Sequence, residues 1–365
     1  MKINLKFIIQ EIFQTIIFAC ILFVVAYIGL NIFIQVIHPN FYLLFSIAIL
    51  LSTINTISAA LEKRKTRRIT RYLAEFSHFF LWFCLMYLIL SAAIYLILLI
   101  VKIPIIYLAI IYLTVIPIIT VYGYIKANKV KINEHDLFIN DLKEELNIIH
   151  FSDVHIGSIR GKKLLRNIVS KINSIDAEIA ILSGDLADGT TPIEIDDFSP
   201  LADSKIPIIF TPGNHDYYPG LENVIKAARN ANLKVLFNDK MEFKGLSIYG
   251  FFVSSALKPG VTIENSNDFS MIKHDEVNIV VNHFPVFWNE FKDLGVDIQL
   301  SGHTHGGQFY PIRFLMSKMF KYARGIFKED DSYLVVSDGV GTWQAPIRWG
   351  TDSEILLLRL KRKVK

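Results

Sequence analysis

Five short stretches of the chain contain the side chains that metal-dependent hydrolysis requires. They combine carboxylate, carboxamide and imidazole groups, and each follows an apolar run. The stretches are Asp153-Val154-His155, Gly184-Asp185, Gly213-Asn214-His215-Asp216, His283 and Gly302-His303-Thr304-His305. Two divalent ions held about 3.5–4 Å apart can bind a phosphoryl oxygen, lower the pKa of a bridging water and stabilise an in-line transition state. We therefore predict a two-metal hydrolytic centre.

The spacing within these stretches indicates which side chains act together. Asp153 and His155 are two positions apart, so on an extended segment both point to the same side. His303 and His305 have the same spacing, and the glycines around them let the backbone approach a bound group closely. An amide oxygen from Asn214 beside imidazoles suits a site of mixed nitrogen and oxygen ligands.

Each stretch has an ordinary structural explanation when it is taken alone. An Asp-x-His triplet can be a surface pair, Asp185 can cap a helix, and His283 can be a hydrogen-bonded core histidine. Taken together the stretches favour a functional site, because five of the ten histidines lie in them, each after a predicted strand. The remaining histidines lie in loops, at a helix start or on the opposite strand face; these are His38, His78, His135, His150 and His274.

The elements that must position these side chains are short apolar strands. Runs at 146–151, 177–182, 206–210, 277–281 and 297–300 end directly at the polar stretches. A helical period at 161–175 separates the first two runs, which indicates an α/β fold. Fully apolar strands predict a sheet covered on both faces, with the site at the strand ends. Further runs at 243–252, 333–337 and 354–360 favour two sheets flanked by helices, in a strand order that the pattern leaves open.

Residues 146–360 resemble the calcineurin-like metallophosphoesterase superfamily. The family pattern of Asp-x-His, Gly-Asp-x-x-Asp, Gly-Asn-His-Asp/Glu, a lone His and Gly-His-x-His is matched in full and in order. The stretch Gly302 to Gln308 and the later Pro346-Ile347-Arg348 with Glu354-Ile355 are similar to a membrane-associated bacterial branch. The resemblance implies a two-sheet αββα sandwich and hydrolysis of phosphoesters.

The resemblance also implies two divalent ions, with manganese expected and iron or zinc as alternatives. One ion would be held by Asp153, His155, Asp185 and His305, and the other by Asp185, Asn214, His283 and His303. Asp185 would therefore bridge the two ions. His215 would protonate the leaving oxygen or stabilise the phosphoryl charge, and Asp216 would orient it. Asp188 completes the second motif, and its structural alternative is a loop-stabilising carboxylate.

The N-terminal third of the chain is far more apolar than the rest. Four stretches, at 12–34, 41–61, 76–101 and 103–125, approach or exceed the roughly 20 apolar residues that cross a bilayer. A buried helical core is the alternative, but unbroken runs without a polar face are uncommon in water-soluble helices. We predict an all-α membrane domain of four transmembrane helices at residues 1–126, and a metallophosphoesterase domain at 127–365.

Charge predicts the orientation in the membrane. A basic loop at 62–68 separates the second and third spans, and Lys126, Lys129 and Lys131 follow the fourth. Because basic loops stay in the cytoplasm, we expect a multi-pass protein of the cell membrane with a cytoplasmic catalytic domain. Residues 1–130 hold 11 Lys and Arg against 3 Asp and Glu, which leaves 27 and 31 for the rest. This slightly acidic remainder argues against sequence-blind nucleic-acid binding.

A predicted amphipathic helix at 312–324 bears on the class of substrate and on how it would reach the site. Its basic residues Arg313, Lys318, Lys321 and Arg324 lie largely opposite its apolar stripe. Such a helix could lie among headgroups and admit lipid phosphates, or could pack on the sheet as an ordinary surface helix. We expect a phosphodiester or pyrophosphate of a lipid or lipid-linked molecule. A soluble nucleotide is the alternative, and a membrane sensor or transporter with a regulatory phosphoesterase domain is disfavoured by the few charges inside the spans.

Overall fold

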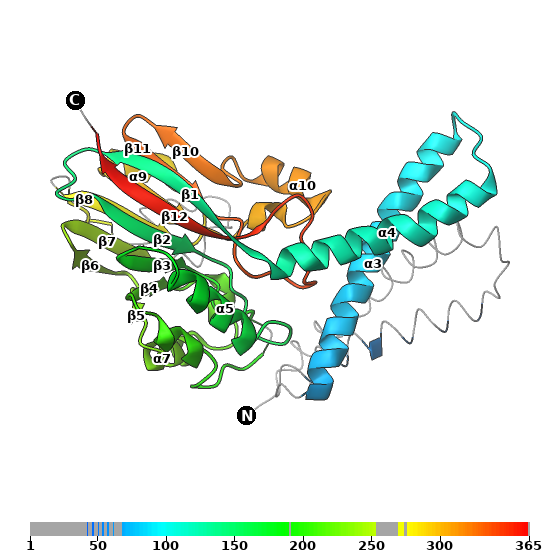
Figure 1. Ribbon diagram of the computed structural model, residues 1–365, viewed down its shortest axis with the longest axis horizontal. Helices are drawn as coiled ribbons and strands as arrows, with labels where there is room; N and C mark the ends of the chain where they lie inside the picture. The colour runs from blue at the N-terminus through cyan, green and yellow to red at the C-terminus, as the bar shows by residue number, and fades with distance from the viewer. Residues whose placement is uncertain are drawn as a thin grey trace, which may run out of the picture. The chain divides into compact units, whose positions relative to one another are not determined.

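The chain forms two compact units, Met1–Tyr122 and Gly123–Lys365, in the computed structural model (Figure 1). The structure describes residues 68–363 apart from 190, 253–268 and 274–275, together with the single helical positions 42, 46, 50, 53, 54, 57 and 61. The assignment of residues 1–126 to a membrane domain and of 127–365 to a catalytic domain stays a prediction.

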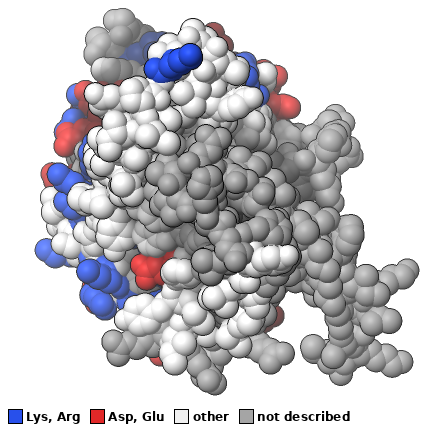
Figure 2. Space-filling view, turned by 90° about the vertical axis from the view of Figure 1, so that its right-hand side faces the viewer, with Lys and Arg blue, Asp and Glu red and all other residues white. Residues whose placement is uncertain are grey.

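The first unit contains two long apolar helices, α3 (Arg68–Leu98) and α4 (Ile105–Asn128), the second of which continues into the second unit. By length and composition both could cross a membrane. The Ser91 and Tyr112 hydroxyl oxygens lie 2.6 Å apart and join the two helices. Most of the described surface in Figure 2 is free of charged side chains. The predicted spans at 12–34 and 41–61 lie outside the described residues, apart from the single positions.

The second unit is a sandwich of two mixed six-stranded sheets (Figure 1). The first sheet has the order β1 (Val130–Ile139), β12 (Ser353–Arg362), β2 (Leu146–Phe151), β3 (Ile179–Ser183), β4 (Ile208–Thr211) and β5 (Lys234–Val235). The second has the order β10 (Gly325–Glu329), β11 (Ser332–Val336), β9 (Ile298–Ser301), β8 (Val277–Asn282), β7 (Leu246–Phe251) and β6 (Asp239–Phe243). This agrees with the predicted sandwich.

The core follows from the apolar runs that form the strands. Alternate side chains such as Ile148, Ile181 and Ile279 are buried between the two sheets. The outer face of the first sheet is covered by α5 (Lys162–Ile172), the short helix η1 (Ser199–Asp203) and α7 (Leu221–Asn230). On the second sheet, α9 (Trp288–Asp293) contributes to a separate apolar cluster. Because both faces of the central strands are buried, their sequences are continuously apolar.

Two sequence predictions need correction. The run at 243–252 is not one strand: Phe243 ends β6, and β7 begins at Leu246. The hairpin turn between them, Lys244 and Gly245, has positive φ at both residues, as two-residue hairpin turns of type I′ require. The amphipathic helix predicted at 312–324 is shorter: α10 spans Ile312–Met319, and Phe320 is already extended.

The sheet topology gathers the predicted site. The strands β2, β3 and β4 run parallel, and so do β7, β8 and β9. Carboxyl ends of parallel strands lie at one edge of a sheet, which is where loops form binding sites in α/β folds.

Candidate dinuclear metal centre

The seven predicted metal ligands come from loops at these carboxyl ends. The first sheet supplies four of them and the second sheet three. Asp153 and His155 follow β2, Asp185 follows β3, Asn214 begins α6 (Asn214–Tyr217) after β4, His283 follows β8, and His303 and His305 follow β9. The centre therefore lies where the two sheets meet at one end of the sandwich.

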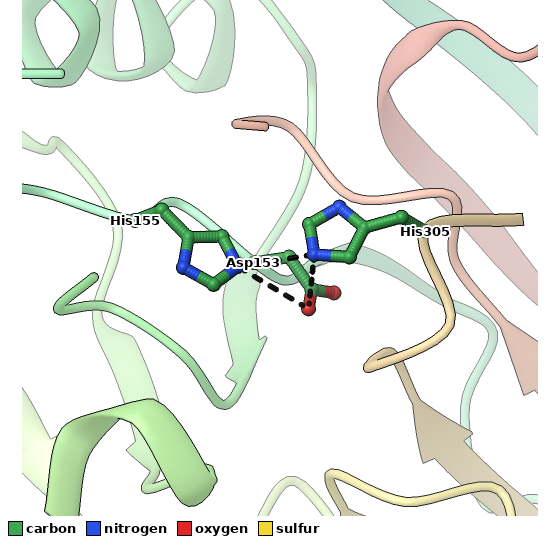
Figure 3. Close-up of side chains that lie close together, drawn as sticks. All are labelled: Asp153, His155 and His305. Atoms are coloured by element: carbon green, nitrogen blue, oxygen red, sulfur yellow. Dashed lines mark hydrogen bonds and ion pairs between the residues drawn. The ribbon is translucent and has the colours of Figure 1, made fainter. Parts of the chain in front are cut away.

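The side chains converge into three overlapping groups. Asp153, His155 and His305 form the first group (Figure 3). The second is His155, Asp185 and His215, and the third is Asp185, His283 and His303. Within each group the possible ligand atoms all lie within 4.8 Å of one another. Asn214 Oδ1 lies 3.1 Å from His303 Nδ1, so the amide joins the third group. The structure thus brings all seven residues together, and Asp185 is shared between two groups.

Local backbone turns, rather than extended segments, aim these side chains. Asp153, His155, Asp185, His303 and His305 have φ values between 51° and 69°. The left-handed conformation is uncommon for residues other than glycine and costs on the order of 1–3 kcal/mol. The expectation of an extended Asp153-to-His155 segment was therefore wrong. His303 and His305 belong to different groups.

Two glycines leave space for the carboxylates of Asp185 and Asp153, because a side chain at either glycine would overlap them. A Cβ on Gly213 would lie 2.2 Å from Asp185 Oδ1, and one on Gly302 would lie 2.4 Å from Asp153 Oδ2. The glycines beside the ligands therefore serve close packing of neighbouring loops against the two carboxylates.

Burial keeps most of the imidazoles neutral, which is the form that binds metal ions. Burial lowers the pKa of His155 and of His303 to about 3, and that of His305 well below its usual value. The Nε2 atoms of His155 and His305 face each other at 3.0 Å. Two buried imidazole nitrogens directed at one point beside the Asp153 carboxylate are a donor set that fits a divalent transition ion.

The side chains of His283 and Asp185 carry opposite charges. Burial opposes the charged form of His283, but the Asp185 and Asp153 carboxylates raise its pKa to about 9. Burial would likewise raise the pKa of Asp185, but His283 and the other imidazoles hold it below its usual value. His283 Nε2 lies 3.0 Å from Asp185 Oδ2, while its Nδ1 faces the Ser183 carbonyl oxygen at 2.7 Å. A metal ion bound by Asp185 and His283 would replace the His283 proton as the positive charge beside this carboxylate, since metal binding releases protons from its ligands.

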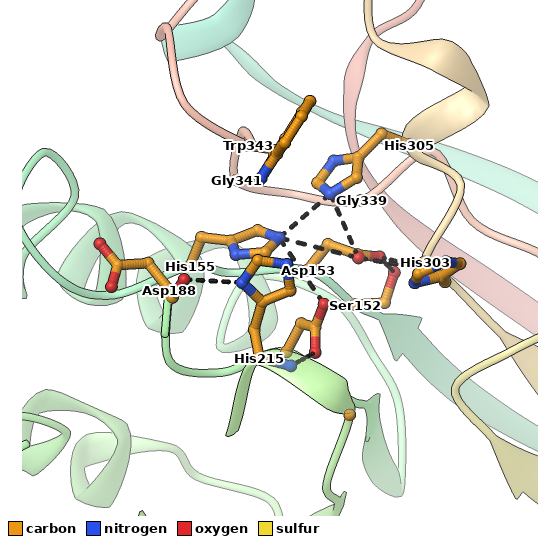
Figure 4. Close-up of polar contacts among 12 residues, drawn as sticks. Ser152, Asp153, His155, Asp188, His215, His303, His305, Gly339, Gly341 and Trp343 are labelled. Atoms are coloured by element: carbon orange, nitrogen blue, oxygen red, sulfur yellow. Dashed lines mark hydrogen bonds and ion pairs between the residues drawn. The ribbon is translucent and has the colours of Figure 1, made fainter. Parts of the chain in front are cut away.

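His215 lies beside the ligands but is held by the backbone. Its N–H donates to Asp185 Oδ1 at 2.8 Å, and its Nδ1 lies 2.7 Å from the carbonyl oxygen of Asp188 (Figure 4). The ring centroids of His215 and His155 are 4.8 Å apart. Because Nδ1 donates to the Asp188 carbonyl, Nε2 is the nitrogen that can exchange a proton with a substrate.

Asp216 does not make the contact that we predicted for it. Its two carboxylate oxygens accept hydrogen bonds from the backbone N–H groups of Asp185, Ala187 and Gly213, at 2.7–2.8 Å. The orienting contact on His215 comes from Asp188 instead. Asp216 is the third residue of α6, and its side chain turns back toward the loops and satisfies their N–H groups. The Asp188 carboxylate accepts from the Ser158 N–H at 3.0 Å, which matches the loop-stabilising alternative.

One supporting loop was not found from the sequence. In the loop 338–341, Val340 N–H donates to the Ser152 carbonyl and Gly341 N–H to the Asp153 carbonyl, at 2.9 and 2.8 Å. Figure 4 shows Gly339 and Gly341 in this loop. The fully buried Arg348 holds it, because Nη2 donates to three of its carbonyl oxygens at 2.6–3.0 Å. A lone arginine within an otherwise apolar and glycine-rich segment was the available signal.

Comparisons with known proteins agree with this geometry. Residues 146–307 match the calcineurin-like phosphoesterase family. An uncharacterized metallophosphoesterase of Helicobacter pylori is 31% identical over 239 residues, which are 64% of this chain and 64% of that protein. One of Campylobacter jejuni is 31% identical over 237 residues, 62% of each chain. A Danio rerio protein named as a transmembrane protein with a metallophosphoesterase domain is 27% identical over 67% of this chain and 61% of its own length. The alignments thus cover less than two thirds of each of these relatives.

Proposed function

Since residues 146–307 carry a calcineurin-like phosphoesterase domain, we propose that this chain is a membrane-anchored, dinuclear-metal-dependent phosphoesterase that hydrolyses phosphodiester or pyrophosphate bonds. The observation that carries the proposal is the convergence of two carboxylates and the imidazoles at one end of the sandwich, with Asp185 shared between two groups. A purely structural polar core would not need five residues in left-handed turns.

Two divalent ions fit the donor set. In the proposal Asp153, His155, Asp185 and His305 hold one ion, and Asp185, Asn214, His283 and His303 hold the other. Bound there, the ions would supply an activated water and neutralise charge on the phosphoryl group. Manganese is the proposed metal, and iron or zinc would be accepted by the same ligands.

The residues of the chain contribute positioning and proton transfer. The buried loops fix the ligands before substrate binds, because Asp216 ties the Asp185 loop to the Gly213 loop. His215 is oriented through Nδ1 by the Asp188 carbonyl. In its imidazolium form, in which both ring nitrogens carry a proton, its Nε2–H would donate that proton to the leaving oxygen, or a hydrogen bond to the phosphoryl group, as the P–O bond breaks.

Membrane anchoring is supported by the apolar helices α3 and α4 and by the printed name of the Danio rerio relative. We propose a multi-pass arrangement with the catalytic domain, residues 127–365, on the cytoplasmic side, because basic residues concentrate in the sequence 62–68 and at the end of α4 and just after it. The proposed substrate is a lipid or a lipid-linked molecule. The same chemistry on a soluble nucleotide is the alternative.

An activity panel tests the proposal. The purified full-length protein would be assayed with Mn²⁺ on lipid phosphoesters, nucleotides and bis(p-nitrophenyl) phosphate. We expect hydrolysis by the wild type and loss of at least about 1,000-fold in Asp185→Ala, because the shared ligand is removed. Asp203→Ala is the matched control, since this carboxylate is exposed on η1. Full activity of Asp185→Ala would refute the proposal.

A further inference from the structure

We propose that α10 (Ile312–Met319) is a membrane-docking surface, whose exposed apolar face inserts among the headgroups of an anionic bilayer and presents the metal centre to lipid phosphates. This rests on the proposed phosphoesterase function and specifies how its lipid substrate would be reached.

The apolar side chains of α10 are exposed to an unusual degree. Phe314 is 62% exposed, Leu315 50% and Met319 61%, and no residue of the helix is buried. Leu315 and Met319 are four positions apart and so lie on one face, with Phe314 and Lys318 beside them. Ile312 and Met316, which adjoin them on the same apolar stripe, are half-buried. A helix that packed its whole apolar stripe on the domain would bury Leu315 and Met319 as well.

The charge around this face suits anionic headgroups. The sequence from Gly302 to Gly325 contains no Asp or Glu, but it contains two arginines and two lysines. Lys318 and Lys321 are exposed. Basic side chains close to a bilayer are attracted to its anionic lipids, and apolar neighbours add burial among the acyl chains.

An exposed tryptophan lies in a loop that contacts Gln308, three residues after the proposed metal ligand His305. Trp343 is 49% exposed. Gln308 holds its loop, since Nε2 donates to the carbonyl oxygens of Trp343 and Ala345 at 3.1 Å, and Oε1 accepts from the Trp343 N–H at 2.8 Å. Tryptophan is enriched where proteins meet the membrane interface. In the proposal this exposed tryptophan, whose backbone is held by Gln308, extends the docking surface beyond α10.

The last turns of α4, from Gly123 on, belong to the second unit and contact the segment 348–352. Within that unit, Arg348 N–H donates to the Gly123 carbonyl at 3.0 Å, and Lys126 pairs with Asp352 at 2.6 Å. Arg313, at the start of α10, donates to the carbonyl oxygen of Gly350. One segment, 348–352, thus contacts both the last turns of α4 and the first turn of α10.

Both ends of α10 are tied to metal ligands. The 3₁₀ turn η2 (His305–Gly307) precedes it, and a Cβ on Gly307 would lie 2.3 Å from Arg313 Cα. After the helix, the ring centroid of Phe320 is 5.7 Å from that of His303. When α10 lies among headgroups, the metal centre is therefore held close to the depth of the lipid phosphates.

The first test measures where α10 lies. The full-length protein, with Cys20 and Cys84 replaced by alanine, would be placed in nanodiscs of phosphatidylcholine and phosphatidylglycerol. Nitroxides at Phe314→Cys and Met319→Cys should collide more with oxygen than with a water-soluble nickel chelate. The exposed Lys234→Cys on β5 is the aqueous control. Water-like accessibility at positions 314 and 319 would overturn the docking proposal.

The second test separates docking from chemistry. Two substrates with the same leaving group would be compared, namely phosphatidyl-p-nitrophenol in phosphatidylglycerol-containing vesicles and soluble bis(p-nitrophenyl) phosphate. Leu315→Ser/Met319→Ser should lower kcat/KM at least tenfold on the lipid and less than twofold on the soluble ester. Ile195→Ser, which also alters an exposed apolar side chain, should change neither.

The outcomes distinguish the two proposals. Equal effects of Leu315→Ser/Met319→Ser on both substrates, whether a loss or none, would overturn membrane docking and leave the phosphoesterase proposal standing. Absence of metal-dependent turnover by the wild type on either substrate would instead overturn the phosphoesterase proposal, even if the nitroxides report insertion.

Discussion

The carboxylate of Asp216 accepts a hydrogen bond from the backbone N–H of Asp185 at 2.8 Å, and the same oxygen accepts from Gly213 N–H. A side chain that binds no ion in the proposal thus fixes the loop of the shared ligand. Its second oxygen accepts from the N–H of Ala187. Asp216 therefore acts on the centre through the backbone of its neighbours.

We predict that Asp216→Asn lowers both stability and metal affinity. An amide has one acceptor oxygen, so at least one buried N–H loses its partner, at a cost of about 1–3 kcal/mol. The melting temperature and a Mn²⁺ titration of the full-length protein would measure the two effects. Asp239→Asn, at an exposed position, is the control. Wild-type melting together with wild-type affinity would contradict the role given to Asp216.

We predict that His215→Ala lowers kcat by roughly 10²–10⁴-fold, the usual contribution of a general acid. The variant should keep its metal ions, since His215 is not a proposed ligand. The loss should be larger for an alkyl phosphodiester than for bis(p-nitrophenyl) phosphate, whose leaving group needs little protonation. An equal loss on both esters would argue against proton donation by His215.

We predict that Arg348→Met destabilises the fold by roughly 3 kcal/mol or more, because three carbonyl oxygens of the loop 338–341 lose their buried donor. Arg359→Met on β12 is the matched control. That guanidinium is 39% exposed and pairs with Glu134 at the surface, so its loss should cost about 1 kcal/mol or less. Similar melting temperatures for the two variants would contradict the prediction.

Asp297 should make stability depend on pH. Burial, with Asp141 and Asp331 nearby, raises its pKa from 3.8 to about 6, although its Oδ2 accepts from the Asn278 N–H. The folded protein therefore holds this proton more tightly than the unfolded chain does. The resulting stability is present below pH 3.8 and is lost as the pH rises through 6.

Asp297→Asn keeps an acceptor for Asn278 without the charge. We predict that the melting temperature of the variant, relative to wild type, rises between pH 4 and pH 7. At neutral pH the difference should correspond to about 3 kcal/mol. Melting curves of the full-length protein at several pH values measure it, and a difference that stays constant or falls would contradict the prediction.

The sequence predicted the strands and the convergence of the site for one physical reason. Each apolar run that ends at a polar residue, such as the one before Asp153, became a buried strand whose carboxyl end lies at the shared edge. A strand buried on both faces is a continuous apolar run, which can be recognised without knowledge of its partners. The strand order could not be predicted, because pairing joins strands that are far apart in the chain. The β6–β7 hairpin is local, but its Lys244-Gly245 turn lacks the Asn-Gly or Asp-Gly sequence that marks such turns most strongly.

The contacts within the site were less predictable. The left-handed turns at Asp153 and His155 depend on hydrogen bonds to the Asp185 loop, which the spacing of the residues does not specify. The partner of His215 is a backbone carbonyl, and any residue type at position 188 would supply one. Arg348 contributes through main-chain acceptors in the same way. Backbone partners leave no signature in residue type, so a pattern of side chains could not reveal them.

Metal stoichiometry tests the central claim most directly. The full-length protein would be stripped with a chelator, reloaded with Mn²⁺, desalted and analysed for bound metal by mass spectrometry, alongside Asp185→Ala and Asp203→Ala. The account predicts two ions per chain for wild type and Asp203→Ala, and loss of both metal and turnover in Asp185→Ala. Stripped wild-type protein that holds no transition ion and still hydrolyses phosphoesters at its full rate would contradict it.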